Sequence, residues 1–311
     1  MKPDDIAAAM DRIRTHVRTT PVIDVPAGQL GLFQPVTLKL ELMQHAGSFK
    51  TRGAFNRTMM AAGSGEIGPA GLIAASGGNH GAAVAYVASQ LQMAAEIFVP
   101  STSPAIKRAR IESFGATVNV VDGYFDDAYA AAVERQGTTG ALMVHPFEHA
   151  AIIAGQGTMS IEIDDQVGEY DTLLVSAGGG GFIAGQAAWV QDRRRVISVE
   201  PTTSRCLYAA REHGGPTPVT VAGIAADSLG TVHLGTVAWT IVQHYVDDSV
   251  LVTDDHIRAA QRSLWDEFRL VVEPGGAAAL AALQSGVYVP EPGERVVVAV
   301  CGGNCDPNSV L

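Results

Sequence analysis

Short apolar runs alternate with helix-forming stretches along most of this chain, and this alternation limits the folds open to it. The runs that predict strands are Val36–Met43, Leu72–Ser76, Ala95–Pro100, Thr117–Val121, Ala141–His145, Thr172–Ser176, Val196–Val199 and Arg295–Val300. Most of them are continuously apolar, which is typical of strands that are covered on both faces of a parallel sheet. We therefore expect an α/β fold built on open, mostly parallel sheets.

Helical patterns lie between these runs. They cover Asn79–Leu91, Pro104–Phe114, Asp126–Arg135, Ala151–Asp165, Phe182–Gln191, Asp254–Leu270 and the Ala-rich stretch Gly275–Leu283. The Asp254–Leu270 pattern is the clearest, because its apolar residues share one face and Thr253 can cap its first turn.

The chain of 311 residues is long enough for two domains. Candidate boundaries lie in the Gly- and Ala-rich stretch 61–71 and at 146–149. We expect residues 1–70 and 149–311 to form a large domain and residues 71–148 a small mobile one. A ligand would then bind in the cleft between the sheets, near the carboxyl ends of the strands.

Composition narrows the partners and the compartment. The formal net charge of −11 opposes non-specific binding to nucleic acid or to an anionic membrane. No apolar run approaches the length of a membrane span, and the first residues lack a signal-peptide pattern. Three cysteines are too few for a disulfide framework. These features predict a cytoplasmic protein.

One lysine has the setting of a covalent catalyst. Lys50 follows the polar turn Gly47-Ser48-Phe49 and begins a helix-like stretch. A lysine amine can form an imine with a carbonyl cofactor. Three other segments are rich in glycine and small polar residues, as expected around a bound anion: Ser76–Gly81, Gly178–Gly181 and Cys301–Asn304. A lone lysine is usually a solvated surface charge, so it is this context that singles out Lys50.

The glycine run follows a predicted strand and precedes a predicted helix. Backbone amides of Gly178–Gly181 can converge on an anion, and the helix N-terminus adds a partial positive charge, so the run predicts a phosphate site. A rival interpretation is a dinucleotide fingerprint, Gly179-x-Gly181-x-x-Ala184, with Glu200 holding a ribose in an NAD-dependent Rossmann oxidoreductase. That rival leaves Lys50 and the second Gly-rich loop unexplained.

Taken in order, the four segments resemble those of fold-type II pyridoxal-phosphate enzymes, in the serine/threonine dehydratase and serine racemase branch. The resemblance covers nearly the whole chain. It implies the tryptophan synthase β-like fold, with two open twisted sheets flanked by helices, and pyridoxal 5'-phosphate as cofactor. It also implies a homodimer, which is the habit of the family.

The resemblance assigns a role to each motif residue. Lys50 would be joined to the cofactor as an imine, Phe49 would lie beside the ring, and Asn79 would bond its phenolic oxygen. Gly178, Gly179, Gly180 and Gly181 would hold the phosphate, and Cys301 would meet the pyridine nitrogen. The substrate carboxylate would be received by the loop that contains Ser76, Gly77, Asn79 and His80.

The reaction implied is an α,β-elimination. Lys50 would remove the Cα proton of a β-hydroxy amino acid, most simply L-threonine or L-serine, to give a 2-oxo acid and ammonia. A bulkier substrate such as phenylserine or hydroxyaspartate stays open, as does β-replacement of the cysteine-synthase kind. A catalytically dead cofactor-binding protein is disfavoured by the intact Lys50.

Two positions depart from the family pattern. Gly77 stands where serine racemases carry a second acid/base serine, so racemisation should be weak or absent. Glu200 and Ser204 match two ligands of the family's divalent-metal site, but Cys206 stands in place of an aspartate, and losing a hard oxygen ligand weakens binding of Mg²⁺ or Ca²⁺. We therefore expect no metal.

Overall fold

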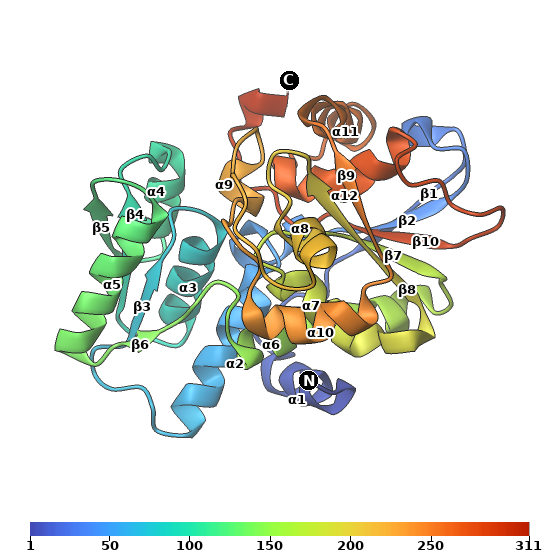
Figure 1. Cartoon of the computed structure of the whole chain (residues 1–311). Coiled ribbons are helices and arrows are strands. Elements are labelled where there is room, and N and C mark those ends of the chain that lie inside the picture. Colours follow the sequence, from blue (N-terminus) through green and yellow to red (C-terminus); the bar gives the residue numbers. More distant parts are fainter. Residues whose placement is uncertain (311) are drawn as a thin grey trace.

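The computed structural model describes residues 1–310 and contains two sheets (Figure 1). The larger has six strands in the order β1-β2-β10-β7-β8-β9. Its strands are β1 Val22–Val25, β2 Val36–Lys39, β7 Thr172–Ser176, β8 Arg195–Pro201, β9 Asp248–Val252 and β10 Val296–Ala299. Only β1 runs antiparallel to its neighbour; the other pairs are parallel. The α/β class and the mostly parallel pairing are thus confirmed.

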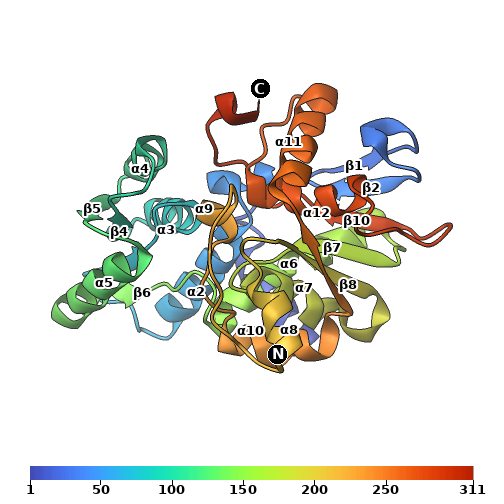
Figure 2. The ribbon, with the colours of Figure 1, turned by 45° about the horizontal axis from the view of Figure 1, so that its top comes forward.

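The smaller sheet has four strands in the order β5-β4-β3-β6, all of them parallel. They are β3 Leu72–Ala75, β4 Ala95–Pro100, β5 Thr117–Val121 and β6 Leu142–Met143. Every one of these strands falls between residues 71 and 148. Figures 1 and 2 show them with their helices as one group beside the larger sheet. The domain bounds and the mobility of the small domain stay predictions.

Helices cover both faces of each sheet. Around the larger sheet, α1 Pro3–Ile13, α6 Ala150–Val167, α7 Gly181–Val190, α8 Cys206–His213 and α10 Thr236–Tyr245 lie on one face, and α11 Asp254–Phe268 and α12 Pro274–Gln284 on the other. The smaller sheet has α3 Asn79–Gln90 and α4 Ala105–Glu112 on one side and α5 Phe125–Thr139 on the other. Helix α2 Lys50–Gly63 packs against both α6 and α3. The short α9 is Ala226–Leu229.

The central strands match the sequence patterns closely, whereas β1 and β9 were not predicted. β3, β7 and β10 are buried at every residue, and this produces the continuous apolar runs. β1 and β9 are the edges of the larger sheet, partly exposed and interrupted by charge at Asp24 and Asp248. Helices α1, α8, α9 and α10 were not predicted either. None of the helices formed by residues 1–310 is long and apolar enough to cross a bilayer.

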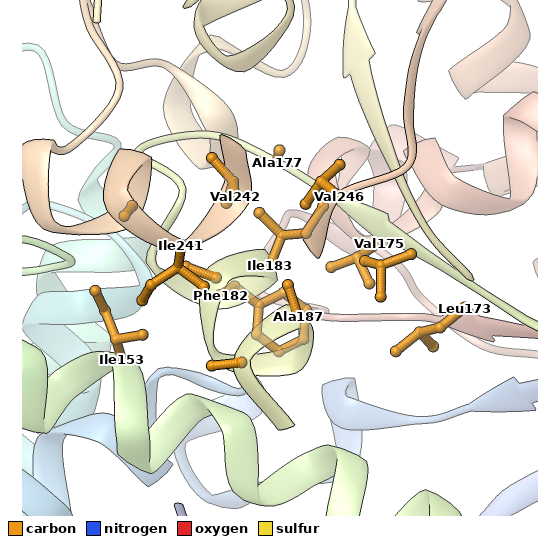
Figure 3. Packing of buried hydrophobic residues seen from close by; sticks show 14 of the residues in the cluster. Ile153, Leu173, Val175, Ala177, Phe182, Ile183, Ala187, Ile241, Val242 and Val246 are labelled. Carbon is orange, nitrogen blue, oxygen red and sulfur yellow. The ribbon is translucent and has the colours of Figure 1, made fainter. Parts of the chain in front are cut away.

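The helix that follows the glycine run is held in the main core. Figure 3 shows Phe182, Ile183 and Ala187 of α7 between side chains of β7 and α10. On its other side α7 approaches α6 closely, because both helices carry glycine where they touch. A Cβ on Gly185 would lie 2.5 Å from the carbonyl oxygen of Ile153 and 2.6 Å from the amide nitrogen of Gly157. The α6–α7 packing therefore fixes where the glycine run points.

We expect Gly185→Ala to lower the free energy of unfolding by about 1–3 kcal/mol, because the added methyl group meets rigid backbone. Gly137→Ala is the matched control: Gly137 lies in α5, and among the described residues no atom lies within 4 Å of the position that its methyl group would take. There alanine should stabilise the helix by up to about 1 kcal/mol. Urea denaturation of both variants measures the difference, and equal effects would contradict the close approach of α6 and α7.

Candidate active site

The four motifs of the sequence meet at the carboxyl ends of parallel strands. The Ser76 loop follows β3, the glycine run follows β7, and Cys301 follows β10. The Lys50 turn is tied to the Cys301 segment by backbone pairing: the amide of Phe49 donates to Cys301 at 3.2 Å, Gly303 donates to Gly47 at 3.0 Å, and Ser48 pairs with Gly302. Segments more than 200 residues apart in the chain thus form one site.

Lys50 is the first residue of α2 and is partly buried. Its Nζ donates a hydrogen bond of 2.9 Å to the carbonyl oxygen of Pro146. Burial lowers the pKa of Lys50 to about 8, although the carboxylate of Glu273 raises it in part. A sizeable neutral fraction near pH 8 suits an amine that must attack a carbonyl or accept a proton.

The glycine run forms a cup of free amides. Among residues 1–310, no acceptor is found for the N–H groups of Gly178, Gly179, Gly180 or Gly181, and α7 begins at Gly181. Gly180 has a φ of 84°, in the left-handed region. A Cβ on Gly179 would lie 2.5 Å from the ring of Phe147. Free amides at a helix N-terminus are the donor set that a phosphate group needs.

Two residues predicted to contact the cofactor, Phe49 and Cys301, are joined by a backbone hydrogen bond. The rings of Phe49 and Phe182 stack with centroids 3.9 Å apart. Cys301 is buried, with its Sγ 3.5 Å from the carbonyl oxygen of Gly275. Burial raises the pKa of the Cys301 thiol, so the group is neutral. An amine, an aromatic ring, a neutral thiol and an amide cup together fit a phosphorylated aromatic aldehyde.

Asn79 is held by two side chains. Its Nδ2 donates to Oε1 of Glu273 at 2.5 Å, and its Oδ1 accepts from Nδ2 of Asn304 at 2.7 Å. Asn304 also donates to the carbonyl oxygen of Ala46 at 2.7 Å. These bonds fix which way the Asn79 amide faces and leave its second N–H hydrogen for a ligand.

The predicted carboxylate loop lies at the N-terminus of α3, which begins at Asn79. The Gly78 amide donates to Oγ of Ser76 at 3.2 Å. The imidazole of His80 turns away from the loop, with Nε2 2.7 Å from the carbonyl oxygen of Val144, and burial lowers its pKa to about 3. What His80 offers a substrate is therefore its backbone amide. A Cβ on Gly77 would run into Oγ of Ser103, so this hydroxyl occupies the space of a missing side chain.

The carboxyl group of Glu200 bonds backbone amides in the first turn of α8. It is fully buried and accepts from the amides of Leu207 and Tyr208 at 2.9 and 2.7 Å, and burial raises its pKa to about 8. Its carboxyl is not free to hold a ribose, which removes the basis of the oxidoreductase alternative.

The other two residues at the positions of the family's metal site also bond the backbone: Ser204 donates to the carbonyl oxygen of Leu229 and Cys206 to that of Gly178. In the part of the chain that the structure describes, no three His, Cys, Asp or Glu side chains form a group able to bind a metal ion.

Three contributors were missed by the sequence reasoning: Glu273, Asn304 and Pro146. Asn304 lay inside a recognised motif, but nothing there pointed to Asn79. Glu273 had a signal, because it is the one charge in the apolar stretch Leu270–Gly275. Pro146 acts through its carbonyl oxygen, which any residue could supply.

A cavity of about 370 Å³ adjoins the site between α3, α4 and residues 303–305. Gly78, Lys107 and Asn304 line it, and Lys50 does not. Lys107 is nearly buried and pairs with Asp227 at 2.6 Å, which links α4 of the smaller sheet to α9. The cavity thus lies beside the reacting amine rather than around it.

Comparisons with known proteins agree with this geometry. The family model described as "Pyridoxal-phosphate dependent enzyme" matches residues 13–302. The chain is 36% identical over 299 residues to the L-threonine dehydratase biosynthetic IlvA of Haemophilus influenzae, covering 94% of this chain and 58% of that protein. It is 34% identical over 304 residues to the phenylserine dehydratase of Ralstonia pickettii, covering 97% of this chain and 92% of the other.

Among solved structures, maize serine racemase superposes with a TM-score of 0.91 at 30% identity, covering 99% of this chain and 95% of the other. The fold-type II architecture expected from the sequence is confirmed by this likeness. The chain spans little more than half the length of the biosynthetic threonine dehydratase, so likeness to that protein does not by itself carry over the activity of the whole.

Proposed function

Because the chain belongs to the family of pyridoxal-phosphate dependent enzymes, we propose that it is a dehydratase that converts a β-hydroxy amino acid to a 2-oxo acid and ammonia. L-Threonine or L-serine is the default substrate. The observation that carries the proposal is the position of the Lys50 amine, which is near Cys301 and bonds Pro146, the residue before the Phe147 ring on which the glycine run packs. When bound, the cofactor supplies an aldehyde for amines and a ring that accepts electrons.

Lys50 acts as the base. Its pKa of about 8 means that the amine is partly neutral at physiological pH, and a neutral amine can take the Cα proton of the substrate. The same nitrogen would also hold the cofactor, so one side chain would have two roles. The free amides of Gly178–Gly181 would hold the phosphate group of the cofactor.

The loop from Ser76 to His80 orients the substrate. Its amides and the side chain of Asn79 lie at the start of α3, where the helix dipole favours a carboxylate. With the carboxylate held there, the Cα proton can be presented to Lys50. The imidazole of His80 is neutral and bonded to Val144, so it adds no charge to this subsite.

The neutral Cys301 thiol favours elimination over reactions that need long-lived negative charge on the bound substrate. A thiol with a raised pKa offers only a weak hydrogen bond to a ring nitrogen and cannot act as a carboxylate counter-ion. Prompt loss of a β-hydroxyl group then becomes the easier outcome. Gly77 lacks the side chain that a second acid/base would need, so racemisation should be weak.

The size of the β-substituent is the open part of the proposal. The relative from Ralstonia pickettii is named for phenylserine, a larger β-hydroxy amino acid than threonine. The test is a panel of L-serine, L-threonine, phenylserine and 3-hydroxyaspartate, with release of 2-oxo acid as the readout. Release from L-threonine or L-serine supports the default. Release from phenylserine alone would mean that the substrate is a bulkier β-hydroxy amino acid. No release from any of the four compounds overturns the proposal.

Two further parts of the proposal concern assembly and compartment. We expect a homodimer, as in the family, which light scattering on the purified protein measures. We also expect a cytoplasmic location, which suits the three free cysteines Cys206, Cys301 and Cys305.

A further inference from the structure

A buried carboxyl group in the site has no role in the scheme above. Glu273 precedes α12 and is 2% exposed. Its Oε1 accepts from Asn79 at 2.5 Å, whereas its Oε2 has no hydrogen-bond partner among residues 1–310. An unpaired carboxylate oxygen away from water is costly, so the group is expected to gain a proton or a partner during function.

Backbone contacts place Glu273 next to the Lys50 turn. Its amide donates to the carbonyl oxygen of Gly302 at 3.1 Å, and Gly302 pairs in turn with Ser48, two residues before Lys50. A Cβ on Gly302 would run into Oε1 of Glu273, so glycine at 302 leaves room for the carboxyl group. The position of Glu273 is therefore fixed by the same strand end that holds Cys301.

Lys50 and Glu273 are close enough for each to shift the other's titration. Burial raises the pKa of Glu273 to about 7 and lowers that of Lys50 to about 8, while the opposite charges partly offset both shifts. Because burial disfavours both charged forms, the charged pair and the neutral pair lie close in free energy. The charged and titratable groups that face Glu273 come from four parts of the chain: Lys50 of α2, Lys107 of α4, Asp227 of α9, and the thiols of Cys301 and Cys305.

We propose that Glu273 is a positioning residue that orients the Asn79 amide and takes up the proton that Lys50 releases before its amine reacts. An N–H bond of the Lys50 ammonium breaks and its electron pair stays on nitrogen. Lys50 and Glu273 form no direct ion pair, so the proton crosses by way of a water molecule, which gives up one proton as it gains another, and an O–H bond forms at Oε2 of Glu273, the oxygen without a partner. Ammonium and carboxylate become amine and carboxylic acid, so the net charge of the pair does not change. The inference rests on the proposed function in one respect, that Lys50 is the reacting amine.

The test is an infrared difference spectrum of the cofactor-free protein before and after adding pyridoxal phosphate at pH 8, without substrate. At that pH Glu273 starts mostly ionised. The wild type should gain the carbonyl stretch of a protonated carboxyl group, which lies apart from the carboxylate bands. Glu273→Gln, which keeps the size and can still accept from Asn79, should lose this gain.

Two controls make the assignment specific. Glu200→Gln removes another buried carboxyl group with a raised pKa, and the gained band should persist in it. Glu291→Gln changes an exposed carboxyl group and should also leave the band in place. A wild type that gains no band, or a gain that survives Glu273→Gln, overturns the proposal. Because no substrate is present, this result is independent of whether the protein releases 2-oxo acid.

Discussion

Replacing Lys50 by alanine should lower the release of 2-oxo acid by roughly a thousandfold or more. The change removes the side-chain amine that bonds Pro146 near Cys301, and with it the proposed covalent hold on the cofactor and the proposed base for the Cα proton. The fold should survive, because Lys50 makes one side-chain hydrogen bond, to Pro146. Initial rates and urea denaturation measure the two effects separately.

Two further variants give this experiment its controls. Lys50→Arg keeps the positive charge but supplies a group that stays protonated and forms no imine, so it should be as inactive as the alanine variant. Lys2→Ala removes an exposed lysine at the N-terminus, outside the site, and should leave the rate unchanged. If Lys50→Ala keeps more than about a tenth of the wild-type rate, the role given to Lys50 is wrong, since a general base alone contributes more than that.

Replacing Arg52 by alanine should lower the free energy of unfolding by about 3–5 kcal/mol. Arg52 lies on α2 two residues after Lys50 and is fully buried. Its guanidinium bonds both oxygens of Glu41 at 2.7 Å and Oε1 of Glu162 at 2.7 Å. Without Arg52, Lys39 is left as the one cation among the described residues beside the buried carboxylates of Glu41 and Glu162. Its Nζ lies 2.7 Å from Oε2 of Glu162. The expected loss is large because buried charges are left without a partner.

Arg57→Ala is the matched control, because Arg57 lies on the same helix. Its partner Glu66 has a side chain that is 48% exposed and can be solvated when the pair is broken. We expect a loss of about 1 kcal/mol or less. Denaturant titrations of both variants measure the difference, provided that the unfolding free energy depends on denaturant concentration with the same slope in each. Similar losses for the two would mean that the Arg52 network does not hold α2 in place.

The sequence predicted the covered strands of the larger sheet better than its edge strands. Strands such as β7 and β10 are apolar throughout because both faces are buried, and that is a local signal. The edge strands β1 and β9 are defined by a neighbour on one side only, so their residues need not be apolar on both faces. Their existence depends on contacts between distant segments, which no local pattern records.

The same distinction holds for the site. The motifs of Lys50, Asn79, Cys301 and the glycine run have local signatures, and the structure brings all of them together. Side-chain direction has no such signature: the imidazole of His80 faces Val144, and the carboxyl of Glu200 caps α8. The partnership of Glu273 with Asn79 joins residues 194 positions apart, and only the folded chain reveals it.

The role of Lys50 is tested most directly by finding where the cofactor is attached. Purified protein is treated with borohydride, which fixes an imine as a stable amine, then digested and examined by mass spectrometry. We predict that the peptide containing Lys50 carries the reduced pyridoxal phosphate and that Lys50→Ala carries none. Modification of a different lysine, or a wild type with no modified peptide after incubation with the cofactor, would contradict this role.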